Sequence, residues 1–92
     1  MLSNYATTWT TDDNGNGSVT YHQTTIVEWT PETITLRHDG HETTTTKRKM
    51  NQAADQFGLG FSVVQRRGTW WVDDGSGELP FHDGIVLRRT SN

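Results

Sequence analysis

The sequence predicts an α+β fold in which an antiparallel β-sheet, or a small open barrel, carries one short helix. Of the 92 residues, 16 are Thr, a β-branched type that favours strands, and most of them precede Lys47. Asn-Gly and Asp-Gly pairs supply turn signals between the strand-like runs. Only one segment has the apolar spacing of a helix. The expected order is β-β-β-β-α-β-β-β, in a single domain covering residues 1–92.

Four strands are expected before the helix. The run Asn14-Gly15-Asn16-Gly17 consists of residues that tolerate positive φ, so a hairpin turn joins strands around 5–11 and 18–29. Ile34 and Leu36 alternate with Thr and Arg in a third strand at 33–37. Asp39-Gly40 then turns the chain into a fourth strand at 42–46.

The helix is expected at about residues 47–57. Thr46 or Thr45 is the predicted N-cap. Gly58 suits the left-handed position after the helix, and Leu59 supplies the apolar contact of a Schellman ending. The apolar residues that define the buried face recur at i, i+3, i+4 and i+7, and they are Met50, Ala53, Ala54 and Phe57.

A tight hairpin around Gly68 is expected after the helix, with strands at 61–67 and 69–73. Trp70 and Trp71 are adjacent in the second of these strands, so one points into the core and the other outward. A last strand is expected at 85–89. The predicted core residues of the hairpin are Phe61, Val63, Trp70 and Val72.

Composition excludes several classes of protein. Only 17 residues are Leu, Ile, Val or Phe, but nine aromatic residues, four of them Trp, indicate a folded domain with a thin core. The absence of Cys excludes disulfides and thiolate nucleophiles. No apolar run approaches the roughly 20 residues of a membrane span, and no signal peptide is evident, so we expect a soluble, unexported protein. Because so small a domain disfavours a large catalytic cleft, we expect neither enzymatic activity nor a cofactor.

The charge is unevenly distributed, although the net charge is only -3. Residues 47–67 carry five cations against Asp55 alone, and a second basic pair lies near the carboxyl end. Cations beside an exposed aromatic ring can bind phosphates while the ring stacks on a base or a guanidinium. The candidate binding residues are Lys47, Arg48, Lys49, Gln52, Arg66, Arg67, Trp71, Arg88 and Arg89.

Two weaker patterns concern metal ions. Asp12, Asn14 and Asn16 follow the alternate spacing of a calcium loop, but Gln23 stands where such a loop needs a bidentate Glu, and a plain hairpin turn explains the same residues. His38, His41 and His82 lie beside Asp39 or Asp83, in turns that do not fix imidazoles as a helix does. We therefore expect no metal site, and calcium binding by the first loop stays an open alternative.

The helix and the hairpin after it resemble a known family. The pieces Thr45-Thr46-Lys47, Met50-Asn51-Gln52 and Gln56-Phe57-Gly58-Leu59-Gly60 are similar to a family of small uncharacterised proteins of tailed bacteriophages, over about residues 24–84. The resemblance implies a viral source and an existence in the cytoplasm of the infected bacterial host. It implies no catalytic residue, and Asp39-Gly40-His41 departs from the Gly-Gly pair of the family.

These observations favour a phage accessory protein that is not an enzyme and that binds a host or viral macromolecule, such as a host defence or nucleic-acid-processing protein. Direct binding of nucleic acid through the basic 47–67 surface is the alternative, and the net charge ranks it below a protein partner. A third possibility is a virion or assembly component, since Thr-rich strands offer edges for self-association. No membrane partner is expected.

Overall fold

The computed structural model describes residues 6–89, which form four strands, one helix and four further strands. The predicted α+β class and antiparallel pairing are confirmed, and neither sheet closes into a barrel. Tyr5, at the start of the first predicted strand, lies outside the described residues. The elements are β1 (Thr7–Thr11), β2 (Gly17–Tyr21), β3 (Thr24–Trp29), β4 (Thr33–Leu36), α1 (Thr44–Phe57), β5 (Ser62–Arg66), β6 (Thr69–Asp73), β7 (Glu78–Pro80) and β8 (Ile85–Arg88).

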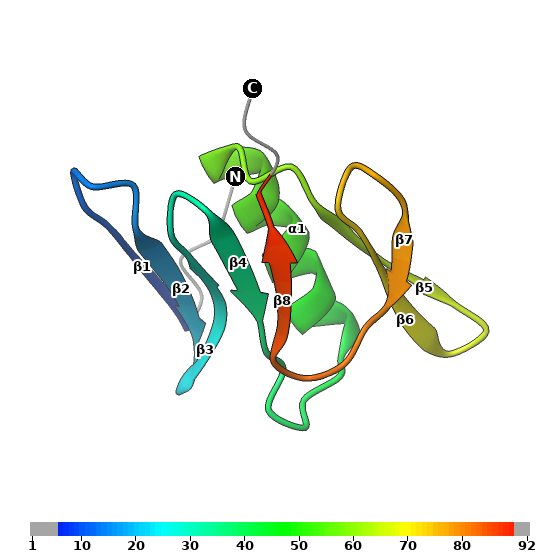
Figure 1. Cartoon of the computed structure of the whole chain (residues 1–92). Coiled ribbons are helices and arrows are strands. Elements are labelled where there is room, and N and C mark those ends of the chain that lie inside the picture. The colour runs from blue at the N-terminus through cyan, green and yellow to red at the C-terminus, as the bar shows by residue number, and fades with distance from the viewer. Residues whose placement is uncertain (1–5, 90–92) are drawn as a thin grey trace.

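The strands form two antiparallel sheets. The larger sheet has the order β1-β2-β3-β4-β8, and the smaller sheet has the order β5-β6-β7. Helix α1 lies behind β4 and β8 in the view of Figure 1, with the smaller sheet on its other side. It contacts β2 and β3 of the larger sheet and β5 of the smaller one. The helix therefore packs against both sheets and connects them.

Two of the predicted strands before the helix are wrong. The segment 18–29 is not one strand but two, because the chain reverses at His22, whose φ is 56°. A β-bulge follows the turn, since Val19 pairs with Val27 while Thr20 pairs with Thr25. The bulge inserts Ile26, so that Ile26 and Val27 are both buried although they are neighbours. The strand predicted at 42–46 is absent, and the helix begins there instead.

Helix α1 starts three residues earlier than about 47, and its N-cap is Thr43 rather than Thr45 or Thr46. The Thr43 hydroxyl accepts the backbone N–H of Thr46 at 3.2 Å. Thr46 is itself buried inside the first turn, which leaves it unavailable as the cap. The ending is as predicted: Gly58 has the left-handed φ of 62°, and the N–H of Leu59 donates to the Ala54 carbonyl, as in a Schellman motif.

The predicted hairpin is confirmed, with Arg67 and Gly68 both at positive φ in a two-residue turn. Its four predicted core residues are buried, and of the tryptophan pair Trp70 points inward while Trp71 is half-buried on the other face. Strand β7 was not predicted. Its three residues include Pro80 and acquire strand character only by pairing with β6.

The core lies between the larger sheet and the helix and continues beneath the hairpin. Trp29 packs against Phe57 with ring centroids 4.8 Å apart. The Trp29 ring also covers Gly17, where a Cβ would come within 2.1 Å of a ring carbon. Only glycine fits at this position, because the aromatic ring occupies the space that any side chain would need.

Asn51 connects the helix to the outer edge of β5. Its side-chain amide donates to the Val63 carbonyl at 2.9 Å, and its oxygen accepts the Val63 N–H at 2.7 Å. One amide group thereby satisfies both outward backbone groups of Val63, with which an additional strand would otherwise pair. Asn51 makes the helix a substitute for a fourth strand in the smaller sheet.

Candidate functional site

The outward face of the smaller sheet presents a partly apolar row with one aromatic residue at its centre. The register places Val64 of β5 opposite Trp71 of β6, and Trp71 opposite Pro80 of β7. The guanidinium of Arg66 lies 5.7 Å from the centroid of the Trp71 ring and forms an ion pair with Glu78. We call these five residues, Val64, Arg66, Trp71, Glu78 and Pro80, the Trp71 face.

Two of the predicted cations of residues 47–67, Lys47 and Arg66, lie near one end of β5. The Lys47 ammonium donates to the Gln65 side chain at 3.4 Å, which brings the first turns of α1 to the residue preceding Arg66. Gln65 and Arg66 are successive strand residues, so their side chains lie on opposite faces of the strand. Lys47 is therefore on the helix side of β5, while Arg66 is on the Trp71 face. The cations share an end of the strand but do not form one continuous face.

The remaining helix residues among the candidates divide between surface and core. Arg48 and Gln52 line a shallow groove of about 340 Å³ on the outer side of α1. Lys49 points the other way and is only 4% exposed, with its Nζ 5.4 Å from the centroid of the Tyr21 ring. Burial lowers the pKa of the Lys49 ammonium. Lys49 is thus part of the interior and cannot contribute to an exposed basic surface.

The candidates at the end of β8 are separate from the others. Figure 1 shows β8 in the middle of the molecule, with its arrow ending at the top and away from the turn between β5 and β6 at the right. Arg88 is exposed, whereas Arg89 donates through its guanidinium to the Thr30 carbonyl at 2.8 Å. The Arg89 backbone N–H also donates to the Glu32 carbonyl. Arg89 therefore fastens β8 to the turn before β4.

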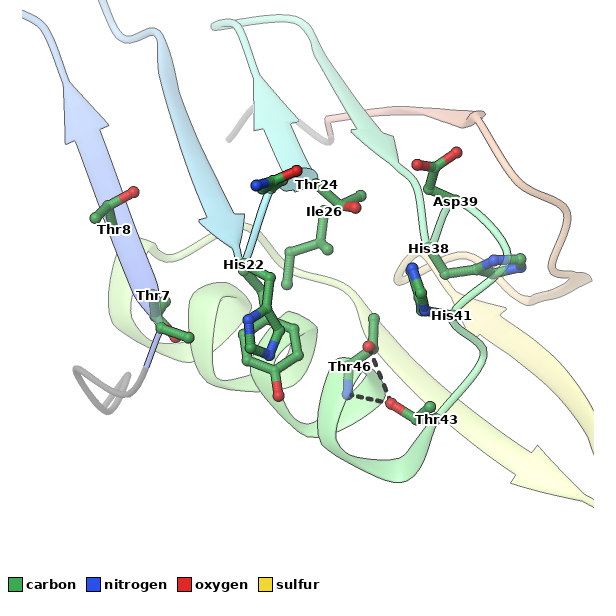
Figure 2. Close-up of a pocket in the computed structure, with 13 residues that line it drawn as sticks. Thr7, Thr8, His22, Thr24, Ile26, His38, Asp39, His41, Thr43 and Thr46 are labelled. Carbon is green, nitrogen blue, oxygen red and sulfur yellow. Dashed lines mark hydrogen bonds between the residues drawn. The ribbon is translucent and has the colours of Figure 1, made fainter.

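A polar pocket of about 1000 Å³ lies beside the start of β1, at the turn between β2 and β3. Figure 2 shows His22 from that turn, His38 and His41 from the loop after β4, and Thr43 and Thr46 at the start of α1 around this space. Of these residues the sequence pointed only to His38 and His41 as possible ligands. His22 carried no signal, because nothing in its neighbourhood indicates the left-handed turn that exposes it.

His38 is held in place by packing and backbone contacts. Its ring stacks on Phe81 with centroids 5.4 Å apart and meets Trp70 edge-on at 5.6 Å. Its Nδ1 accepts the Gly40 N–H at 3.0 Å, which occupies one of the two ring nitrogens. Within residues 6–89 no cluster of three His, Asp or Glu side chains is arranged to hold a metal ion.

Asp83 joins the pocket loop to the segment before β8. One carboxylate oxygen accepts the N–H groups of His38 at 3.0 Å and Asp39 at 3.3 Å. Burial raises the pKa of Asp83, but these hydrogen bonds, with the nearby positive charge of Arg37, outweigh it and hold the pKa below its ordinary value. The ionised carboxylate is therefore the form that holds the loop.

The Asp12 loop is a self-contained turn. The Asp12 carboxylate accepts the N–H groups of Asn14 and Asn16, each at 2.9 Å, and the Asn16 side-chain amide at 3.0 Å. These bonds, those from Asn16 first, lower the pKa of Asp12. Gln23, the last position of the calcium spacing, lies in the turn at the other end of β2. The calcium spacing in the sequence does not bring its positions together in space.

Comparison with known proteins identifies a viral family and nothing more specific. Within residues 6–89, no helix is long and apolar enough to cross a membrane. No curated protein and no solved structure matches the chain. The family model described as "Kyanoviridae Gp96 protein" matches residues 2–88, a longer stretch than the resemblance at about 24–84. This protein is therefore a member of the Kyanoviridae Gp96 protein family, a family of cyanophage proteins.

Proposed function

We propose that this phage protein is not an enzyme and that it binds a protein of the host or of the phage through the Trp71 face, in the cytoplasm of the infected cell. The observation that carries the proposal is the row formed by the half-buried Val64 and Trp71 and the exposed Pro80, with Arg66 directed over the tryptophan ring. Trp and Arg are the residue types that most often dominate binding at protein interfaces. A flat, partly apolar face with one aromatic anchor suits a folded protein surface.

The charges of the Trp71 face favour a protein over a nucleic acid. Arg66 is paired with Glu78, so this face has no excess positive charge of its own. Nucleic-acid affinity depends on neutralising several phosphates together, and the other cations of the chain are dispersed over separate surfaces. A protein partner can use the paired Arg66 and Glu78 as complementary hydrogen-bonding groups at the rim of the contact.

Affinity capture from nuclease-treated lysate of infected cells tests the proposal. Wild-type protein should retain a defined partner, and Trp71→Ala should reduce its recovery at least tenfold because the aromatic anchor is lost. Val86→Ala is the matched control, since Val86 is 59% exposed on the other sheet and should leave recovery unchanged. Equal recovery by wild type and Trp71→Ala would show that this face is not the binding surface.

Nucleic-acid binding is the second candidate, favoured by the contact of Lys47 with Gln65, which brings one helix cation to the end of β5 near Arg66 and Arg67. Fluorescence anisotropy with labelled single-stranded and duplex DNA across a salt series tests it. If it holds, affinity falls steeply with salt, and the double variant Arg66→Ala with Arg67→Ala weakens binding further. No binding at about 50 mM salt would eliminate this candidate.

A further inference from the structure

Within residues 6–89 the two sheets have four outer edges, and three of them are blocked or carry a charge. The edge of β5 is occupied by the side chain of Asn51. Strand β7 has three residues and ends at Pro80, which has no N–H to donate. Strand β8 has four residues and ends at Arg88, a charged residue of the kind that discourages edge pairing. The fourth edge is that of β1, at the other side of the larger sheet from β8.

The hydrogen-bonding pattern shows which backbone groups of β1 face outward. The Asp12 N–H donates to the Asn16 carbonyl at 3.0 Å, and the His22 N–H donates to the Ala6 carbonyl at 2.7 Å. Both contacts belong to the same antiparallel register between β1 and β2. Because pairing alternates along an antiparallel strand, the backbone groups of Thr10 face β2, and those of Trp9 and Thr11 face the outer edge.

Within residues 6–89, β1 has none of the charges, prolines or bulges that usually protect an edge. Its five residues are Thr-Thr-Trp-Thr-Thr, with no charge, no Pro and no Gly. No bulge interrupts its register with β2. Edge strands that remain solitary are normally short, charged or bulged, because an unpaired edge is a template for another strand. Strand β1 therefore has the properties of an edge that pairs with a further strand.

We propose that β1 pairs with β1 of a second copy of this chain, antiparallel and with the two-fold axis at Thr10, which joins the two larger sheets into one sheet of ten strands. In this register Trp9 of each copy lies opposite Thr11 of the other. Their outward backbone groups then form four hydrogen bonds across the axis. The pairing uses only Trp9 and Thr11 as backbone partners.

The choice of a second copy over another strand follows from charge and symmetry. The register places Thr10 opposite Thr10 of the second copy, and Thr-Thr pairs are favourable across strands. The nearest charge, Asp12, falls opposite Thr8 of the second copy rather than opposite another carboxylate. A strand pairing with itself about a two-fold axis gives a closed dimer, which is the commonest oligomer symmetry. This self-association is independent of the Trp71 face, which lies on the other sheet.

Sedimentation equilibrium of the full chain tests the dimer. The wild type should approach twice the monomer mass of 10.4 kDa as its concentration rises. Thr10→Lys and Thr10→Glu each place like charges together at the axis, and each should weaken self-association at least tenfold. An equimolar mixture of the two variants should dimerise at least as strongly as the wild type, because the lysine then faces the glutamate. Thr35→Lys is the matched control, since Thr35 lies on β4 in the middle of the same sheet.

A second variant protects the test against misfolding at position 10. Thr11→Pro removes an outward N–H that β2 does not use, so it should keep the monomer folded by circular dichroism and abolish the dimer. A wild type that remains monomeric at millimolar concentration would overturn the proposal. A dimer that persists in Thr10→Lys, Thr10→Glu and Thr11→Pro would overturn it as well, by showing that another surface makes the contact.

Discussion

Replacing Asn51 by Ala should destabilise the protein through the edge of β5. The variant loses both hydrogen bonds to Val63, each with a net stabilisation of about 0.5–1.5 kcal/mol, and leaves a part-buried N–H and carbonyl behind. Alanine is a better helix former than asparagine and returns about 0.5 kcal/mol. The net loss is therefore about 1.5 kcal/mol, a substantial part of the roughly 5–14 kcal/mol that stabilises a domain of this size.

Urea unfolding followed by tryptophan fluorescence measures this loss. With a slope of about 1 kcal/mol per molar urea, the midpoint of Asn51→Ala should fall by about 1.5 M. Gln52→Ala is the matched control: it makes the same kind of truncation at the next helix position, and within residues 6–89 the Gln52 side chain forms no hydrogen bond. The control should be neutral or slightly stabilised. Equal midpoints for the two variants would refute the role assigned to Asn51.

The substitution Asn51→Asp separates the two hydrogen bonds. Aspartate keeps an acceptor for the Val63 N–H but, when ionised, has no donor for the Val63 carbonyl. We expect this variant to be less stable than the wild type at neutral pH. It should recover part of the difference at acidic pH, because the protonated carboxyl can donate. Stability of Asn51→Asp that does not change relative to the wild type between these pH values would contradict the donor role.

Three further predictions concern other positions. Gly17→Ala should cost about 2 kcal/mol or more and change the near-UV dichroism of tryptophan, because its Cβ would overlap the ring of Trp29. Asp83→Ala should lower the unfolding free energy by about 1 kcal/mol at neutral pH. The difference in unfolding free energy between the wild type and Asp83→Ala should disappear as pH falls below 3.8, the ordinary pKa of the carboxyl group, because the pKa of Asp83 is lowered in the folded state. The unfolding free energy of the wild type should rise with pH up to the ordinary lysine pKa of 10.5, because burial lowers the pKa of Lys49 in the folded state and disfavours its charged form. Lys49→Met removes this group, so the variant should show a smaller rise.

Local patterns predicted the elements that depend on local interactions. The helix was found from the spacing of its apolar residues, and its end from the Gly58 and Leu59 pair, because both signals lie within a few residues of each other. The turn was predicted from Gly68 and the inward direction of Trp70 from strand alternation, although Arg67 belongs to the turn and not to the predicted strand at 61–67. Each of these features is fixed before distant parts of the chain are in contact.

The predictions were wrong where tertiary contacts determine the local structure. Four successive threonines can each cap a helix, and the choice of Thr43 depends on burial of Thr46 beneath the fold. The reversal at His22 contains no glycine that would have predicted a turn. Strand β7 forms only because it pairs with β6. The candidate site shows the same division, because the sequence selected Arg66 and Trp71, which lie together in the structure, but could not show that Lys49 is interior.

The bond between Asp83 and His38 spans 45 positions of the chain, and Arg89 reaches back 59 positions to Thr30. During translation, a nascent chain that ends before β8 has the edge of β4 unpaired and the histidine-bearing loop unanchored. Strand β8, which pairs with β4, is therefore synthesised only after the helix and the smaller sheet. We expect the larger sheet to be completed late, with chaperones meeting an intermediate in which four of its five strands are in place.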